Sequence, residues 1–286
     1  MILLGRFVLG LGVAAVMTAA TTLITDLTTG PARGRFLGLQ AAFMGLGGLV
    51  FLTVGGRLAD IAWFWPFATY VVAWDLVPAA LLTLAPDAPP REMARRREPL
   101  PRFVFGLYAF AFLGMVLFYL APVQLPFLLS QRLEAGGTGI GLALGVMTVT
   151  SAGASFLFAR IQRRLDSPGV LILTFAVMAP GLALVGWAGA WVWVLLGMAV
   201  FGVSVGLLGP NLALWISALV PASQRGRALG NLTTAVFLGQ FLSPVLSSPV
   251  TLAGGSLGLV FLHGAALACM VSISVVALRL RPAAVG

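Results

Sequence analysis

The sequence predicts an all-α membrane protein with nine transmembrane helices, and three observations lead to that prediction. Sixty per cent of the 286 residues are hydrophobic, 9% are charged, and the mean hydropathy is +1.05. A soluble domain carries about 25% charged residues because its surface faces water. Apolar runs of about 20 residues, the length that crosses a bilayer as a helix, recur from end to end. We therefore expect a multi-pass protein whose partner is the lipid bilayer of the plasma membrane, such as the bacterial inner membrane.

The apolar runs fall into two groups on either side of a polar segment. Three precede it, near 3–27, 36–59 and 63–84, and six follow it, near 103–131, 138–162, 168–188, 190–218, 227–249 and 254–280. All are rich in Gly, Ala, Ser and Thr, and small residues let helices approach one another closely in lipid. None shows the alternation of polar and apolar residues that is typical of a membrane barrel. The runs are therefore predicted to pack as helical bundles.

The polar segment, PDAPPREMARRREPLPR at 86–102, contains five prolines and eight charged residues. This composition excludes a transmembrane helix and is typical of a linker. We therefore expect a partial N-terminal helical bundle at 1–85, a cytoplasmic linker at 86–102 and a six-helix C-terminal bundle at 103–286.

The net charge of +9 comes from seventeen arginines, no lysine and eight acidic residues. Because the arginines stand at the ends of apolar runs, they indicate membrane orientation, and no nucleic-acid partner is expected. If alternate connections share one side, that side holds fourteen of them: Arg33, Arg35, Arg91, Arg95, Arg96, Arg97, Arg102, Arg160, Arg163, Arg164, Arg225, Arg227, Arg279 and Arg281. The other side holds Arg57 and Arg132. The rich side is predicted to be cytoplasmic, which places the N-terminus of this chain outside and its C-terminus inside.

One segment of the chain occurs twice, at an offset of 192 residues. RGRFLGLQAAFMGLGG at 33–48 and RGRALGNLTTAVFLGQ at 225–240 are identical at seven of sixteen positions, and Gly5 and Gly10 match Gly197 and Gly202. Parallel repeats of six helices are a known transporter architecture. The three helices predicted at 103–188 have no counterparts before the first copy. We therefore expect about 90 further residues, with three more helices, ahead of the first copy.

The chain resembles the last nine helices of a twelve-helix major facilitator superfamily transporter over its whole length. Arg6, Gly10 and Gly12 resemble the fourth-helix motif of the drug/proton antiporters in that superfamily, and GQFLSP at 239–244 and PVQLPF at 122–127 resemble segments of bacterial efflux members. The sequence differs from the family pattern in FLTVGG, which lacks the proline of the antiporter motif, and in FARIQRRLD, which has alanine where an acid is common. The resemblance implies an incomplete major facilitator fold.

Two charged residues are candidates for proton coupling, because a charge within the bilayer is expensive and usually functional. Asp75 lies near the middle of the third run, with Pro78 close by. Its carboxylate is the group that would take up a proton, and a structural ion pair with Arg6 is the alternative. The resemblance implies that Arg6 helps to move a proton; otherwise it reaches to the outer interface.

Polar and aromatic side chains within the runs are the candidates for the substrate cavity. Gln124 lies between Pro122 and Pro126, which are expected to break the helix and to free backbone carbonyls. The cavity candidates are Gln124, Asn211, Gln240, Tyr70, Trp74 and Tyr119. The alternatives are interhelical hydrogen bonding for the amides and core packing for the aromatic rings.

Five charged residues at the cytoplasmic ends are candidates for a gate or an anchor. Arg33, Arg35, Arg225 and Arg227 belong to the two copies of the repeated segment, and Asp26 ends the first run. The resemblance implies that Asp26 pairs with basic residues of a loop between the second and third helices of the family. The arginines are equally consistent with simple anchoring of helix ends.

These features predict a secondary active transporter that moves a small organic molecule by alternating access between two bundles, most simply as an exporter. Proton coupling is a hypothesis. The sequence offers no cluster of metal ligands, no phosphate-binding loop with lysine and no catalytic constellation, so we expect neither an enzyme nor a cofactor. The alternatives are a non-transporting, truncated remnant of such a transporter and a nine-helix protein that completes itself as a dimer.

Overall fold

The computed structural model describes residues 2–28, 30–62, 64–72, 74, 78, 82, 99–252 and 255–280. The elements formed by these residues are all helical. The six runs predicted after the polar segment are confirmed as helices to within three residues: α4 (Arg102–Leu133), α5 (Gly137–Gln162), α6 (Ser167–Trp187), α7 (Trp191–Leu219), α8 (Arg225–Leu252) and α9 (Leu257–Leu280). In the described part of the chain, these six helices are long and apolar enough to cross a membrane. A short 3₁₀ helix, η2 (Ala222–Gln224), joins α7 to α8.

The N-terminal part contains two long helices, α1 (Ile2–Leu27) and α2 (Gly30–Ile61), followed by a 3₁₀ helix, η1 (Trp65–Val71). The first two predicted runs thus lie within helices. The third, at 63–84, begins with η1, where Pro66 occupies the first turn, and most of its remainder lies outside the described residues. The prediction of nine transmembrane helices therefore stays a prediction.

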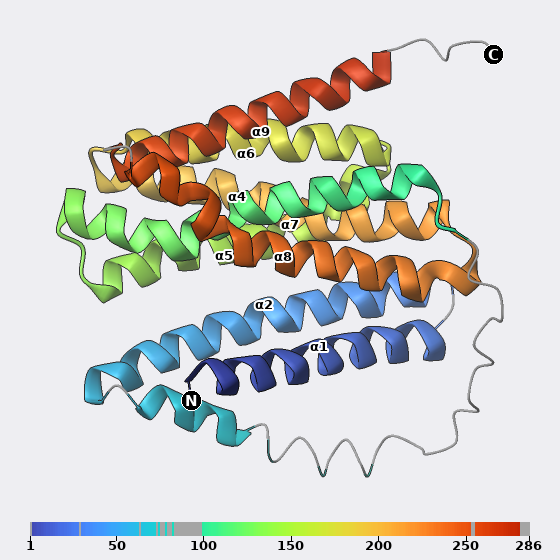
Figure 1. Cartoon of the computed structure of the whole chain (residues 1–286), viewed down its shortest axis with the longest axis horizontal. Coiled ribbons are helices and arrows are strands. Elements are labelled where there is room, and N and C mark those ends of the chain that lie inside the picture. The colour runs from blue at the N-terminus through green and yellow to red at the C-terminus, as the bar shows by residue number, and fades with distance from the viewer. Residues whose placement is uncertain are drawn as a thin grey trace.

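The six C-terminal helices form a single bundle (Figure 1). α6 packs against α7 and α9, α5 packs against α7, and α4 packs against α8. Figure 1 also shows α1 and α2 as a pair along one side of this bundle. The pair meets the bundle where α2 contacts α5.

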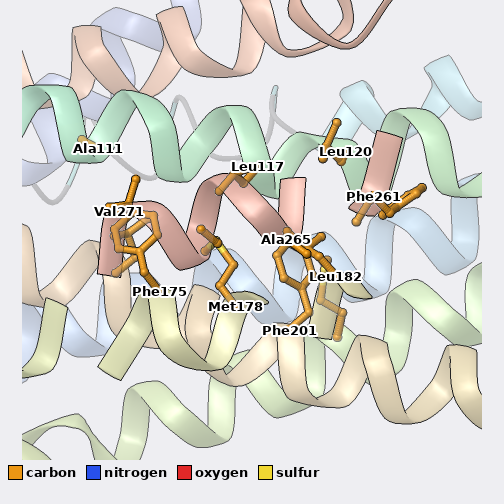
Figure 2. Packing of buried hydrophobic residues seen from close by; sticks show 14 of the residues in the cluster. Ala111, Leu117, Leu120, Phe175, Met178, Leu182, Phe201, Phe261, Ala265 and Val271 are labelled. Carbon is orange, nitrogen blue, oxygen red and sulfur yellow. The ribbon is translucent and has the colours of Figure 1, made fainter. Parts of the chain in front are cut away.

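The core lies between α4, α6, α7 and α9. Figure 2 shows its side chains pointing toward one another: Ala111, Leu117 and Leu120 from α4, Phe175, Met178 and Leu182 from α6, Phe201 from α7, and Phe261, Ala265 and Val271 from α9. Lipid is as apolar as these side chains, so the helices associate through close packing and not through the expulsion of water.

Glycines set how closely the helices approach. A Cβ atom at Gly202 of α7 would lie 2.4 Å from the carbonyl oxygen of Met147 of α5. A Cβ at Gly181 of α6 would lie 2.7 Å from the backbone nitrogen of Phe201 of α7. Both contacts are with backbone atoms, which cannot rotate away as a side chain can. Small residues therefore bring these helices together as the composition predicts.

Candidate functional site

The pair formed by α4 and α8 carries two of the three amides that the sequence singles out. Gly239, Ser243 and Ser247 follow one another at intervals of four residues on α8, and all three are buried. The Ser243 hydroxyl donates a 2.7 Å hydrogen bond to the carbonyl oxygen of Val116 on α4. This stripe of small residues, part of which is the GQFLSP segment, is the surface of α8 that meets α4.

Gln124 and Gln240 lie half-buried on this pair of helices. The Gln124 amide nitrogen donates a 2.9 Å hydrogen bond to the Ser247 hydroxyl oxygen, and the Gln240 amide nitrogen lies 3.9 Å from the sulfur of Met115. Pro122 and Pro126 do not break α4, which continues as a helix through both of them. The expectation of a broken helix is therefore wrong.

Asn211 lies in a different place, at the contact between α6 and α7. Its side chain is fully buried, and its amide nitrogen donates a 3.0 Å hydrogen bond to the carbonyl oxygen of Ser167. Its side-chain oxygen has no hydrogen-bond partner among the described residues. This geometry is that of an interhelical tie, the alternative considered for Asn211 from the sequence.

The three aromatic candidates are not gathered in one place by the described contacts. Tyr119 is half-buried on α4, with its ring edge-on to that of its neighbour Phe118 at a centroid distance of 5.6 Å. Tyr70 belongs to η1, is 51% exposed and stacks on Phe67. Trp74 is 81% exposed. Only Tyr119 therefore shares a helix with Gln124.

The second copy of the repeated segment begins α8. The Arg225 guanidinium donates a 2.9 Å hydrogen bond from Nε to the carbonyl oxygen of Ser217, in the last turn of α7. This contact satisfies a carbonyl at a helix end and is favoured by the negative end of the helix dipole. Arg227 is exposed, and its charge interacts with Tyr108 of α4. The described contacts of Arg225 are those of a helix anchor.

Three residues with specific contacts between helices were not predicted from the sequence. The Tyr108 hydroxyl donates a 2.9 Å hydrogen bond to the carbonyl oxygen of Ala228, which joins α4 to the first turn of α8. Arg132, at the end of α4, donates a 2.8 Å bond to the carbonyl oxygen of Gly186 of α6. In all of these contacts the acceptor is a backbone carbonyl, which leaves no signal in the sequence.

Asp166 is the third missed residue, and it joins α6 to α9. Its carboxylate accepts a 3.0 Å hydrogen bond from the amide of Gly169, which caps the N-terminus of α6. It also forms a 2.9 Å ion pair with Arg279 at the end of α9. A capping residue followed by proline was the available sequence signal, since Pro168 follows Asp166 by two positions.

The other candidates cannot be placed by their side chains. Asp75 lies outside the described residues. Arg6 and Asp26 belong to α1, and Arg33 and Arg35 to α2, but their side chains also lie outside what the structure describes. Their predicted roles stay predictions. Within the described part of the chain, no three His, Cys, Asp or Glu residues are grouped as a metal site would require.

Most of the described arginines lie at one end of the bundle. Arg102 begins α4, Arg160 ends α5, Arg225 begins α8 and Arg279 ends α9, and in an antiparallel bundle these ends coincide. Arg132 lies at the opposite end, in the last turn of α4. In the six-helix bundle, the arginines that the sequence assigns to one side of the membrane therefore lie at helix ends on one side of the bundle.

Known proteins match the chain along almost all of its length. A family model described as Major Facilitator Superfamily matches residues 1–244 and 104–285. The tetracycline resistance protein, class H, of Pasteurella multocida is 23% identical over 290 residues, covering 96% of this chain and 72% of that protein. Multidrug resistance protein 1 of Bacillus subtilis is 24% identical over 256 residues, covering 86% of this chain and 65% of that protein.

Among solved structures, the human organic anion transporter MFSD10 (TETRAN) matches with a TM-score of 0.57 at 19% sequence identity. The match covers 64% of this chain and 44% of that protein, so the chain spans less than half of the solved structure. At this level of identity the likeness concerns the fold alone.

Proposed function

Because the chain belongs to the Major Facilitator Superfamily, whose members are transporters and not enzymes, we propose that it takes part in exporting a small organic molecule across the membrane. The observation that carries this proposal is the match of the family model to residues 1–244 and 104–285. Two relatives named for resistance to tetracycline and to multiple drugs support the outward direction. The driving force would be an ion gradient, with a proton as the coupling ion.

In this proposal, transport proceeds by alternating access between an N-terminal bundle at 1–85 and a C-terminal bundle at 103–286, joined by the linker at 86–102. α2 of the N-terminal part contacts α5 of the C-terminal bundle. Gln124 and Gln240 offer neutral amides toward a substrate on the side of the C-terminal bundle. Tyr119 would contribute an aromatic surface near Gln124.

The arginine-rich end of the bundle supports a cytoplasmic location for that end. The chain would then begin outside the plasma membrane and end in the cytoplasm. Arg33, Arg35, Arg225 and Arg227 would lie at the cytoplasmic face. Arg225 would hold α8 against the end of α7 there, since its Nε already bonds to Ser217.

Transport is tested by expressing the protein in a bacterial strain without its own efflux pumps and measuring the accumulation of tetracycline and ethidium. We expect lower accumulation than in cells with the empty vector, and loss of this difference with a protonophore. Asp75→Asn removes the proposed proton acceptor and should abolish export, whereas Arg164→Gln on the exposed cytoplasmic end should leave it intact. Accumulation that equals the empty vector would refute export by this chain, and full activity of Asp75→Asn would refute the coupling role.

A second candidate, a form that does not transport by itself, is favoured by the surfaces of α1 and α2. No described residue of either helix is buried. At the offset of 192 residues, Gly5, Gly10 and Gly47 correspond to three α7 and α8 glycines: Gly197, Gly202 and Gly239. A Cβ at Gly197, Gly202 or Gly239 would lie within 3 Å of a neighbouring helix, whereas no described residue lies within 4 Å of a Cβ at Gly5, Gly10 or Gly47. α1 and α2 therefore have surfaces suited to further helices.

A pair of substitutions in α2 tests whether these surfaces are covered in the protein that transports. Gly45 corresponds to Phe237, which is 39% exposed, whereas Gly47 corresponds to the tightly packed Gly239. We expect Gly47→Leu to abolish drug export and Gly45→Leu to preserve it. Export by Gly47→Leu at the level of the parent protein would mean that the face of α2 with Gly47 has no neighbour in the transporting state.

A further inference from the structure

The helices α4 and α8 run side by side in the same direction, and their two halves are built differently. In the first half of each helix, the Tyr108 hydroxyl bonds to the carbonyl oxygen of Ala228 at 2.9 Å. Further along, a Cβ at Gly239 would lie 2.5 Å from the carbonyl oxygen of Phe112, so the two backbones almost touch. The Ser243 hydroxyl then bonds to Val116 at 2.7 Å. The two helices are therefore fixed to one another up to Val116 of α4 and Ser243 of α8. The parts of α4 and α8 up to these residues are called the first halves, and the parts beyond them the second halves.

The second halves contain all the prolines of the two helices. Pro122 and Pro126 lie in α4 beyond Val116, and Pro244 and Pro249 lie in α8 beyond Ser243. A proline has no amide hydrogen, so the carbonyl four residues earlier loses its helical partner. Each second half is thus held by fewer backbone hydrogen bonds than the first. Figure 1 shows α8 changing direction along its length, as a helix with internal proline is expected to do.

The carbonyls that lose their partners are those of Phe118, Pro122, Gln240 and Val245. The Val245 carbonyl has a substitute, because the Ser248 hydroxyl donates a 2.8 Å bond to it. That bond stays within α8 and does not connect it to α4. It stiffens one helix only.

A single side-chain hydrogen bond joins the two proline-containing halves in the described part of the chain, and it connects Gln124 to Ser247 at 2.9 Å. Gln124 lies between the two prolines of α4, and Ser247 lies between the two prolines of α8. The Ser247 hydroxyl also donates a 3.1 Å hydrogen bond to the carbonyl oxygen of Pro244, so Gln124 is linked through Ser247 to the backbone of α8. The bond thus stands where both helices are easiest to bend.

We propose that Gln124 and Ser247 form a clasp that makes the second halves of α4 and α8 bend as one unit about the fixed contact at Gly239 and Ser243. Without the clasp, each half would bend independently. The clasp itself follows from the contacts just described, and its part in opening and closing a transport pathway rests on the proposed function. Gln124 and Ser247 are positioning residues in this proposal, since they act through the helices and need not touch a substrate.

Hydrogen–deuterium exchange of the purified chain in detergent micelles tests the clasp. Gln124→Ala should speed exchange roughly five-fold in both second halves, 118–133 of α4 and 244–252 of α8, as expected for loss of one neutral hydrogen bond. Ser247→Ala should do the same. The first halves, 103–115 and 228–239, should exchange as in the parent protein.

Two further variants separate a clasp from local loosening of a helix. Ser248→Ala removes a hydroxyl that bonds within α8, so it should speed exchange at 244–252 and leave 118–133 unchanged. The double variant of Gln124 and Ser247 should exchange no faster than Ser247→Ala alone, because Ser247→Ala already removes the bond to Gln124.

Faster exchange confined to the substituted helix would overturn the proposal, and so would unchanged exchange in Gln124→Ala. Additive effects in the double variant would also overturn it. The measurement needs no transport. A chain that exports nothing but shows coupled exchange would refute the proposed function and leave the clasp in place, and the reverse result would refute the clasp alone.

Discussion

The close approach of α4 and α8 at Gly239 gives a sharp test of the packing described here. Gly239→Ala adds one methyl group, whose carbon would lie 2.5 Å from the carbonyl oxygen of Phe112 and 2.9 Å from the Cβ of Met115. Both neighbours are fixed to the backbone of α4. Because no rotation of a side chain relieves the overlap, the helices themselves must separate.

The size of the effect follows from the distances. Ordinary contact begins at 3.4 Å, so the carbonyl oxygen must retreat by about 0.9 Å. The same movement would stretch the 2.7 Å bond between Ser243 and Val116 to a distance at which it no longer counts as a hydrogen bond. Overpacking costs ~1–3 kcal/mol and a lost hydrogen bond ~1 kcal/mol, less a gain of up to ~1 kcal/mol from replacing glycine in a helix. We expect a net loss of about 1–3 kcal/mol.

Gly230→Ala is the matched control, because Gly230 lies on the same helix and, in the part of the chain that the structure describes, nothing lies within 4 Å of its Cβ position. It should leave stability unchanged or raise it by up to ~1 kcal/mol. The free energy of unfolding is measured by titrating each variant with sodium dodecyl sulfate in mixed micelles and recording helical circular dichroism. If Gly239→Ala were as stable as Gly230→Ala, the helices would not approach as closely as the structure shows.

Two further predictions concern helix ends and use the same unfolding measurement. Arg225→Ala should lower the free energy of unfolding by ~1 kcal/mol, because it removes a charged hydrogen bond from a half-exposed carbonyl at the end of α7, and Arg164→Ala should change it little. Asp166→Asn should lower it by less than ~1 kcal/mol, since the ion pair with Arg279 is exposed, whereas Asp166→Ala should lower it by ~1 kcal/mol more by removing the α6 cap. An Asp166→Asn variant as unstable as Asp166→Ala would mean that the ion pair, and not the cap, stabilises this end.

The positions of the six C-terminal helices were predictable because the bilayer imposes their length. A run of about 20 apolar residues bounded by Arg, Gly or Pro can cross lipid only as a helix, because all its backbone hydrogen bonds must form within the run. The bounds of α4 to α9 agree with the predicted runs to within three residues. The contacts between these helices were much less predictable. They are apolar on all sides, so no polar face tells from sequence which side turns inward.

Because the packing of the helices was not predictable, the positions of the candidate amides within the bundle were not predictable either. Gln124 and Gln240 were singled out as amides in lipid, and the structure places both on the α4–α8 pair. Asn211 satisfied the same rule but lies between α6 and α7. An amide side chain in an apolar run predicts that a hydrogen-bond partner is needed, but it does not predict which helix supplies that partner.

Proline shows how far the sequence can be taken. Each proline within a helix predicts a carbonyl without a partner four residues earlier. Pro210 of α7 frees the carbonyl of Gly206, and the structure supplies the Ser155 hydroxyl of α5 at 2.8 Å. That contact ties two helices, whereas Ser248 serves the carbonyl freed by Pro249 within its own helix. The sequence therefore predicts how many backbone carbonyls lack a helical partner. Whether such a carbonyl accepts a hydrogen bond from a neighbouring helix, or leaves its own helix easier to bend, depends on how the bundle packs.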